Sequence, residues 1–138
     1  MPTPPPRDEF GRVIPHDHPD IPDDYHVIRH TTPHDLHREE GRLTSGAFSE
    51  SRDGGMSVDI EEWMLVANLD ILHYVGNPDH GAVRLNVGSL RALGLKVGWD
   101  PDTGHEHHGA VWGIRGGSSR RKIYSLAERI RPAAGERR

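Results

Sequence analysis

The stretch IEEWMLVANLDILHY (residues 60–74) decides the fold class, because it carries the strongest periodic signal in the chain. Its apolar side chains recur at helical spacing and form one stripe, which leucines widen. The stripe and its flanks are Ile60, Trp63, Met64, Ala67, Ile71 and Tyr74, with Leu65, Leu69 and Leu72. Asp59 is a candidate N-cap, and Glu62 stands where a capping box has its acid. We predict one long helix over residues 60–73.

Short strands are expected on both sides of this helix. Residues 25–31 include the adjacent apolar pair Val27 and Ile28, which is typical of a strand covered on both faces. Further strands are predicted at residues 56–58, 82–87, 95–99 and 109–114, a helical turn at 33–38, a short helix at 88–93 capped by Ser89, and another at 123–130. This order predicts an α+β fold with a mixed or mostly antiparallel sheet, one long helix and a short C-terminal helix.

Length and composition favour a single small domain. Of the 138 residues, only 33% are hydrophobic and 28% are charged, so the core must be thin. Residues 1–24 hold seven of the eleven prolines and no apolar periodicity, which predicts an extended or disordered arm. We expect the domain to span residues 25–132 and a disordered tail to follow at 133–138.

Two features that the sequence lacks exclude several kinds of site and location. The chain has no cysteine, which excludes disulfides, thiolate metal sites and a Cys nucleophile. It also has no leader-like start and no apolar run near the ~18 residues of a membrane helix, so we expect a cytoplasmic protein without a membrane partner.

Charge is distributed unevenly. Residues 1–24 carry two arginines against six carboxylates, and residues 109–138 carry eight basic residues against two acidic ones. A partner that bears phosphate, either a small molecule or RNA, would suit the basic end. A solvated basic helix with a ragged tail explains the same pattern.

The chain contains eleven histidines, and they are densest at residues 105–108. His105 and His107, two apart in an extended segment, would face the same side and could share a zinc-type divalent metal with a third ligand from elsewhere. A surface loop rich in histidine is the structural alternative.

The segment that enters the last predicted helix could hold a phosphate. Glycines let backbone amides turn toward an anion, and a helix start supplies free N–H groups. The candidate phosphate-binding residues are Arg115, Ser118, Ser119, Arg120, Arg121 and Lys122. A serine cap on a surface helix is the alternative.

Four short motifs also occur in a suggestive order: HVIR at residues 26–29, Ala47-Phe48, Met56-Ser57-Val58 and a late His108 before a strand. In this order they resemble a family of small bacterial proteins of no established activity, in which Leu stands at the place of Met56. The resemblance covers about residues 21–132.

The resemblance implies a shared site of His26, Arg29, Ser57 and His108. The order of these residues is also similar to that of ADP-ribosyltransferases, which bind NAD. Glu106 is the counterpart that the chain offers for the catalytic glutamate of that class.

The leading hypothesis is a small intracellular enzyme that acts on a nucleotide or RNA phosphate. His26 and His108 would serve as acid and base, and Arg29 and Arg115 would hold the phosphate. One rival is a non-catalytic interaction domain that meets a protein partner or a second copy of itself. The other is a histidine-rich protein that binds a divalent metal.

Overall fold

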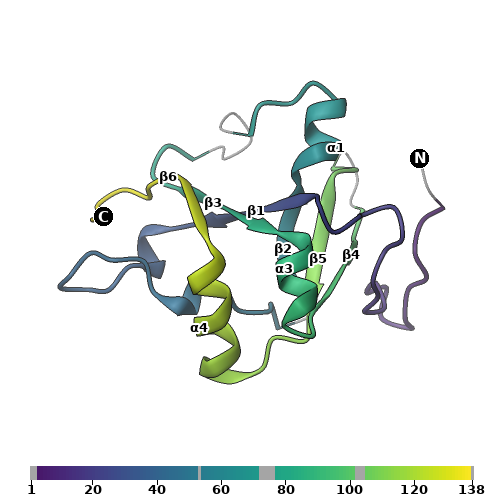
Figure 1. The fold of residues 1–138 in the computed structure, drawn as a ribbon, viewed down its shortest axis with the longest axis horizontal. Helices are drawn as coiled ribbons and strands as arrows, with labels where there is room; N and C mark the ends of the chain where they lie inside the picture. Colours follow the sequence, from purple (N-terminus) through teal and green to yellow (C-terminus); the bar gives the residue numbers. More distant parts are fainter. Residues whose placement is uncertain (1–2, 53, 72–76, 102–104, 138) are drawn as a thin grey trace.

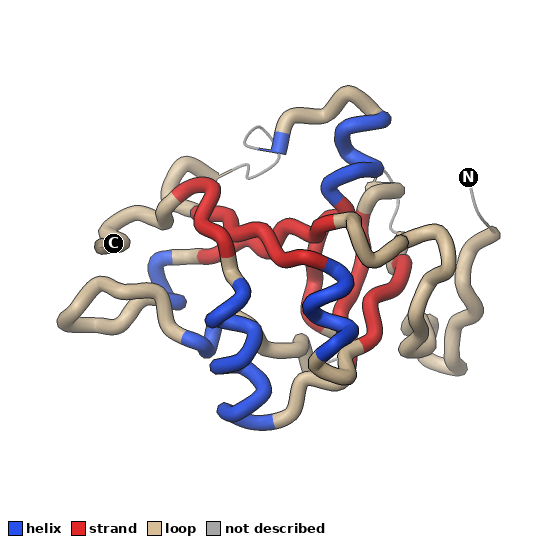
Figure 2. Tube along the Cα trace, in the orientation of Figure 1, coloured by secondary structure: helices blue, strands red, loops and turns tan. Residues whose placement is uncertain are grey.

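The computed structural model describes residues 3–52, 54–71, 77–101 and 105–137. Its centre is a six-stranded sheet in the order β4-β5-β2-β1-β3-β6, in which every neighbouring pair is antiparallel (Figures 1 and 2). The strands are β1 (His26–Thr31), β2 (Met56–Ile60), β3 (Gly81–Asn86), β4 (Lys96–Trp99), β5 (His108–Trp112) and β6 (Glu128–Arg131). The prediction of a single α+β domain with an antiparallel sheet is confirmed.

Helices flank the sheet on two sides. They are α1 (Glu61–Val66), α3 (Val87–Ala92) and α4 (Gly116–Leu126), with short 3₁₀ turns at η1 (Pro33–Asp35) and η2 (Ser45–Ala47). Figure 1 shows α3 and α4 on one side of the sheet and α1 on the other. Within the described ranges, no helix has both the length and the apolar character needed to cross a membrane.

The core lies between the sheet and the pair α3 and α4. β2 is an interior strand, paired with β1 on one side and β5 on the other, and it alternates strictly. Met56, Val58 and Ile60 are buried, whereas Ser57 is exposed and Asp59 is half-buried. The buried set packs with Leu90 of α3 and Ile123 of α4, so the opposite face of β2 is left for polar side chains.

The predicted long helix is interrupted. α1 ends at Val66, and Asn68 has a φ of 59°, the left-handed conformation that terminates helices. The helix also starts one residue later than predicted, at Glu61, because Asp59 and Ile60 belong to β2. The N-cap is therefore Ile60 and not Asp59. Pairing with neighbouring strands outweighs helical periodicity at these two residues. Ile71 again has helical backbone, and the last two residues of the predicted helix, 72 and 73, lie outside the described ones.

Two further boundaries differ from prediction. α3 is capped by the Asn86 side chain, which accepts a hydrogen bond from the Ser89 amide at 2.9 Å, so Ser89 is not the cap. α4 ends at Leu126, and Ile130 lies in β6, which pairs with the edge of β3. The unpaired edge of β3 gives residues 128–131 backbone partners that a longer helix would not have.

The Pro-rich segment before β1 lies along the β4 edge of the sheet. Its residues 16–18 act as a strap: the His18 amide donates to the Val97 carbonyl, and the Val97 amide donates to the Asp17 carboxylate at 2.8 Å. A Cβ on Gly98 would lie 2.5 Å from the His16 carbonyl, so this close approach requires glycine. The strap leads to Ile21, which is fully buried in the core.

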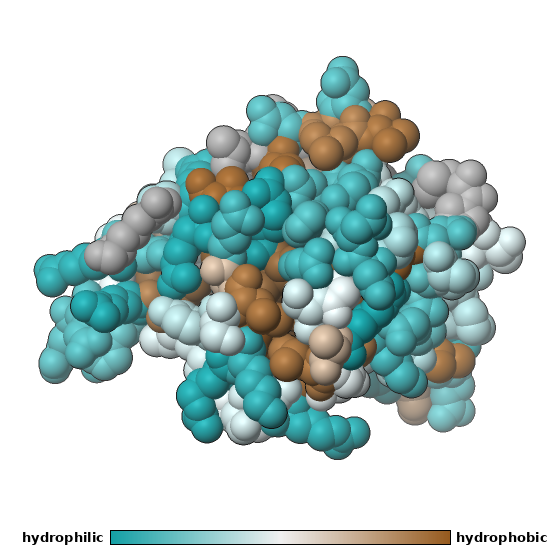
Figure 3. Space-filling model, viewed as in Figure 1, coloured by the Kyte–Doolittle hydropathy of each residue, from teal (hydrophilic) through white to brown (hydrophobic). Residues whose placement is uncertain are grey.

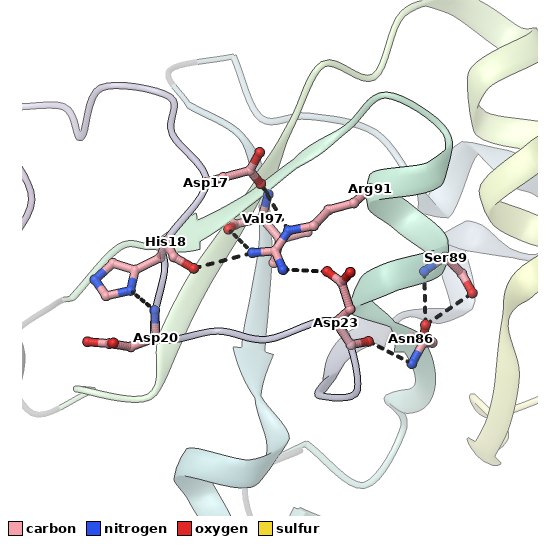
Figure 4. A network of polar contacts seen from close by, with 8 residues as sticks. All are labelled: Asp17, His18, Asp20, Asp23, Asn86, Ser89, Arg91 and Val97. Atoms are coloured by element: carbon pink, nitrogen blue, oxygen red, sulfur yellow. Dashed lines mark hydrogen bonds and ion pairs between the residues drawn. The ribbon is translucent and has the colours of Figure 1, made fainter.

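Arg91 of α3 fastens the strap (Figure 4). Its guanidinium donates to the Asp17 carboxylate at 3.2 Å, to the Asp23 carboxylate at 2.8 Å and to the His18 carbonyl at 3.3 Å. One side chain thereby joins two residues of the strap, and Asp23 beyond it, to α3. The fork of donors on arginine allows this, and a lysine would satisfy fewer of the three.

We expect Arg91→Ala to lower the free energy of unfolding by about 1–3 kcal/mol, because it removes several charge-assisted hydrogen bonds at once. Chemical denaturation measures the change. Limited proteolysis should cut the variant first within residues 7–20. Arg120→Ala on α4, outside this network, is the control; equal stability of Arg91→Ala and the wild type would contradict the role of the clamp.

Candidate functional site

A cavity of about 310 Å³ opens on the face of the sheet opposite α3 and α4. Ser57 and Asp59 reach it from β2, His30 from β1 and His108 from β5. His105 and His107 complete its polar wall from the segment that precedes β5. The register explains this gathering, because Asp59 is the cross-strand partner of both Ile28 and His108.

Asp59 lies between two imidazole rings. One carboxylate oxygen is 3.3 Å from His30 Nε2, and the other is 3.6 Å from His107 Nε2. The His107 side chain is 6% exposed and that of His30 is 30% exposed. In both contacts Nε2 is buried and lies beside the carboxylate as an electrostatic contact, because neither pair has the geometry of a hydrogen bond.

Burial sets the protonation state of both rings. It lowers the pKa of His30 and of His107 below the ordinary value, and the charge of Asp59 opposes this shift without cancelling it. Neighbouring positive charge adds to the lowering: Arg29 lowers the pKa of His30 further, and His105 and His108 do so for His107. Both imidazoles are therefore neutral at neutral pH and become charged only when an anion arrives or the pH falls.

His108 is oriented differently. Its Nδ1 lies 2.7 Å from the carbonyl oxygen of Asp100, which can only accept, so Nδ1 carries the hydrogen. In the neutral ring Nε2 then has a free lone pair, as a general base requires. The cavity thus combines an imidazole whose Nε2 can take a proton with two imidazoles that lie beside the Asp59 carboxylate.

Arg29 supplies positive charge to the cavity wall. β1 and β2 pair only at Val27–Ile60 and Ile28–Asp59, and beyond that point the guanidinium donates to the Ser57 carbonyl at 2.9 Å and to the Ala47 carbonyl at 3.0 Å. Burial lowers its pKa, and Asp35 opposes the shift. Within the described part of the chain, no carboxylate forms an ion pair with it. An anion in the cavity would meet an arginine charge that protein carboxylates have not neutralised.

The structure brings together five of the residues singled out from the sequence. Arg29, Ser57, His105, His107 and His108 all line the cavity, although they come from three separate stretches of chain.

His26, the proposed partner of His108, is placed elsewhere. Its amide donates to Glu62 of α1 at 2.8 Å, and its Nδ1 is 3.3 Å from the same carboxylate. His26 is outside the lining of the cavity, and Glu62 anchors it to the first turn of α1.

The basic residues at the start of α4 form no part of this cavity. Arg115 is the N-cap of α4, and Ser118, Ser119, Arg120, Arg121 and Lys122 follow within the helix, which covers the opposite face of the sheet. The turn before the helix already contains an anion, because Glu50 accepts hydrogen bonds from the amides of Gly113 and Ile114.

The metal hypothesis concerns His105 and His107, whose rings contact edge to face with centroids 6.0 Å apart. Among the residues that the structure describes, no group of three or more His, Cys, Asp or Glu side chains is arranged to hold a metal ion.

Two residues of the site were not identified from the sequence. Asp59 was interpreted as a helix cap, and His30 was not among the candidate site residues. The alternation of β2 contained the missing signal: once the strand extends to Ile60, Asp59 falls on the same face as Ser57.

Comparison with protein-family models, with curated proteins and with solved structures found no match to this chain. The interpretation of the cavity therefore rests on its own geometry and chemistry.

We predict that the protein loses stability as the pH falls below about 6.5, the ordinary pKa of histidine. Burial lowers the pKa of His18, His30 and His107 in the folded chain, so the unfolded chain binds protons first and gains free energy from them. Above pH 6.5 both states are neutral at these residues and the effect vanishes.

Each excess proton in the unfolded chain contributes a slope of about 1.4 kcal/mol per pH unit. Denaturant titrations at pH 7.5, 6.5 and 5.5 measure it. His30→Asn and His107→Asn should each reduce the slope, whereas His34→Asn at an exposed position should not. An unchanged slope in both cavity variants would refute this account.

Proposed function

We propose that the protein is a small enzyme that acts on a phosphate ester, of a nucleotide or of RNA, in the histidine cavity. The single observation that carries the proposal is the arrangement of Asp59 between His30 and His107 in a cavity whose wall also contains Arg29. Neutral imidazoles beside a half-buried guanidinium suit a phosphate dianion, because the guanidinium donates hydrogen bonds to it and its negative charge favours protonation of the imidazoles.

The chemistry starts from the tautomer of His108, whose Nδ1 carries the hydrogen. His108 Nε2 takes a proton from the attacking hydroxyl, which is water or a ribose hydroxyl, as the new O–P bond forms. The bond to the leaving oxygen breaks, and the imidazolium of His30 gives that oxygen a proton. Asp59 orients His30 and stabilises its charged form, and Arg29 stabilises the negative charge on the phosphoryl oxygens.

His30 suits the acid role better than His107 does. Its side chain is 30% exposed, compared with 6% for His107, so it can reach a ligand in the cavity. Phosphate near Arg29 would also raise the pKa of His30, which burial lowers in the free protein. In this scheme His107 contacts the second oxygen of Asp59 and keeps the carboxylate in place.

We expect His108→Gln and His30→Gln each to reduce kcat by about a hundred- to ten-thousandfold, the range for loss of a general acid or base. The assay is hydrolysis or transfer with a dinucleotide, a short RNA, mononucleotides and p-nitrophenyl phosphate. His34→Gln is the matched control, because this histidine is exposed and lies outside the cavity. The proposal would be contradicted if the wild type is active and both cavity variants retain that activity.

A second candidate, the non-catalytic interaction domain, is supported by an apolar surface at the end of α1. Leu65 is 59% exposed and Val66 is 88% exposed. Figure 3 shows hydrophobic side chains gathered over this helix at the top of the molecule. Exposed apolar side chains that adjoin one another are typical of a contact surface.

If this surface joins two copies, the wild type should dimerise with rising concentration and Leu65→Glu should remain monomeric, because the dimer would bury an unpaired carboxylate. Sedimentation velocity between about 5 and 500 µM distinguishes the two, over the range in which weak interfaces associate. Ser125→Glu, at an exposed position on α4, controls for added charge. A wild type that is monomeric throughout rules out the homodimer.

A further inference from the structure

We infer that the substrate is a nucleotide whose base bears an amino group, and that the base binds in a second, aromatic cavity beside the histidine cavity. This inference rests on the proposed function, since it names the part of the substrate that the histidine cavity does not hold. The second cavity has a volume of about 660 Å³ and opens between α1 and the segment that precedes β1.

The walls of the aromatic cavity suit a flat ring. Tyr25 and Trp63 line it together with Pro22 and Val66. Trp63 is held by edge-to-face contacts with Trp99 and His18, whose ring centroids lie 5.7 and 6.1 Å away. A fixed, half-buried indole is a good stacking platform, because its position does not have to be ordered when the ligand binds.

The two cavities share His107, which lines both. Asp59, whose carboxylate lies 3.6 Å from Nε2 of this ring, lines the histidine cavity, and the neighbouring Glu106 lines the aromatic cavity. Trp63 follows Asp59 by four residues, where β2 passes into α1. A ligand with an anionic end and a flat end, joined by a sugar, would place one end on each side of His107.

The charge of the aromatic cavity decides what kind of ring fits. Its charged side chains are the carboxylates of Asp20 and Glu106, with the neutral imidazole of His107. Carboxylates repel a second phosphate and accept hydrogen bonds from exocyclic amino groups, as they do from cytosine N4. Adenine, cytosine and guanine carry such a group, whereas uracil and thymine do not.

The test compares the binding of four probes to the full chain by calorimetry: adenosine 3′-monophosphate, uridine 3′-monophosphate, adenosine and inorganic phosphate. Stacking on one aromatic side chain changes affinity by about fivefold to a hundredfold. We expect the nucleotide to bind at least tenfold more tightly than phosphate and uridine 3′-monophosphate to bind more weakly. Trp63→Ala should abolish this gain and leave phosphate affinity unchanged.

Two surface variants keep the test independent of folding, because Trp63 also packs in the interior. Val66→Trp places a large side chain at an 88% exposed position on the cavity wall and should block the base. Leu65→Trp on the same helix lies outside the lining and should leave nucleotide binding unchanged. The inference is supported if the wild type binds adenosine 3′-monophosphate tenfold more tightly than inorganic phosphate and the Val66→Trp variant binds the two with equal affinity.

The two proposals fail in different ways. The base site is overturned if nucleotide and phosphate bind with equal affinity, or if the Val66→Trp variant still binds the nucleotide more tightly than phosphate. Neither result contradicts the proposed phosphate chemistry. Adenosine binding that Val66→Trp removes, without any binding of phosphate, keeps the base site and overturns the proposed function. Binding of none of the probes overturns both.

Discussion

The strict alternation of β2 is the constraint on which the rest of the structure depends. An interior strand pairs through its backbone on both sides, so its side chains can only point to one face of the sheet or the other. Met56, Val58 and Ile60 take the face that α3 and α4 cover, and this leaves Ser57 and Asp59 on the other. The hydrophobic core and the histidine cavity are thus two consequences of one five-residue strand.

Two half-buried arginines show how differently the fold uses positive charge. Arg84 of β3 donates from Nε and Nη2 to the Glu61 carboxylate at 2.7 and 2.8 Å, and this bidentate bond raises the pKa of Arg84 well above its ordinary range. That charge is neutralised within the protein and fixes the start of α1. Among the described residues Arg29 donates to carbonyl oxygens and not to a carboxylate, so its charge remains available to a ligand.

The sequence predicted the strands well and the site in part. Alternating or continuous apolar residues located β1, β3, β4 and β5 to within a residue or two, because burial against a sheet imposes those patterns. The helix over residues 60–73 failed at its start and middle, since an apolar stripe cannot reveal that Asp59 and Ile60 have backbone partners in another strand or that Asn68 is left-handed. His108 and Arg29, both singled out from the sequence, line the same cavity. The meeting of Asp59 with His30 and His107 depends on strand register, which no local pattern encodes.

The strap over β4 has a consequence beyond the attachment of the N-terminal segment. A sheet of six strands ends in two rows of backbone groups, and an uncovered row is a template on which a strand of another molecule can add. Residues 16–18 occupy amides and carbonyls along the β4 row, although they form no regular strand there. The proline-rich composition of this segment serves the same end, because proline cannot donate to a ladder and so covers an edge without extending it. The strap therefore opposes aggregation, because it hinders strands of other molecules from pairing with the β4 edge.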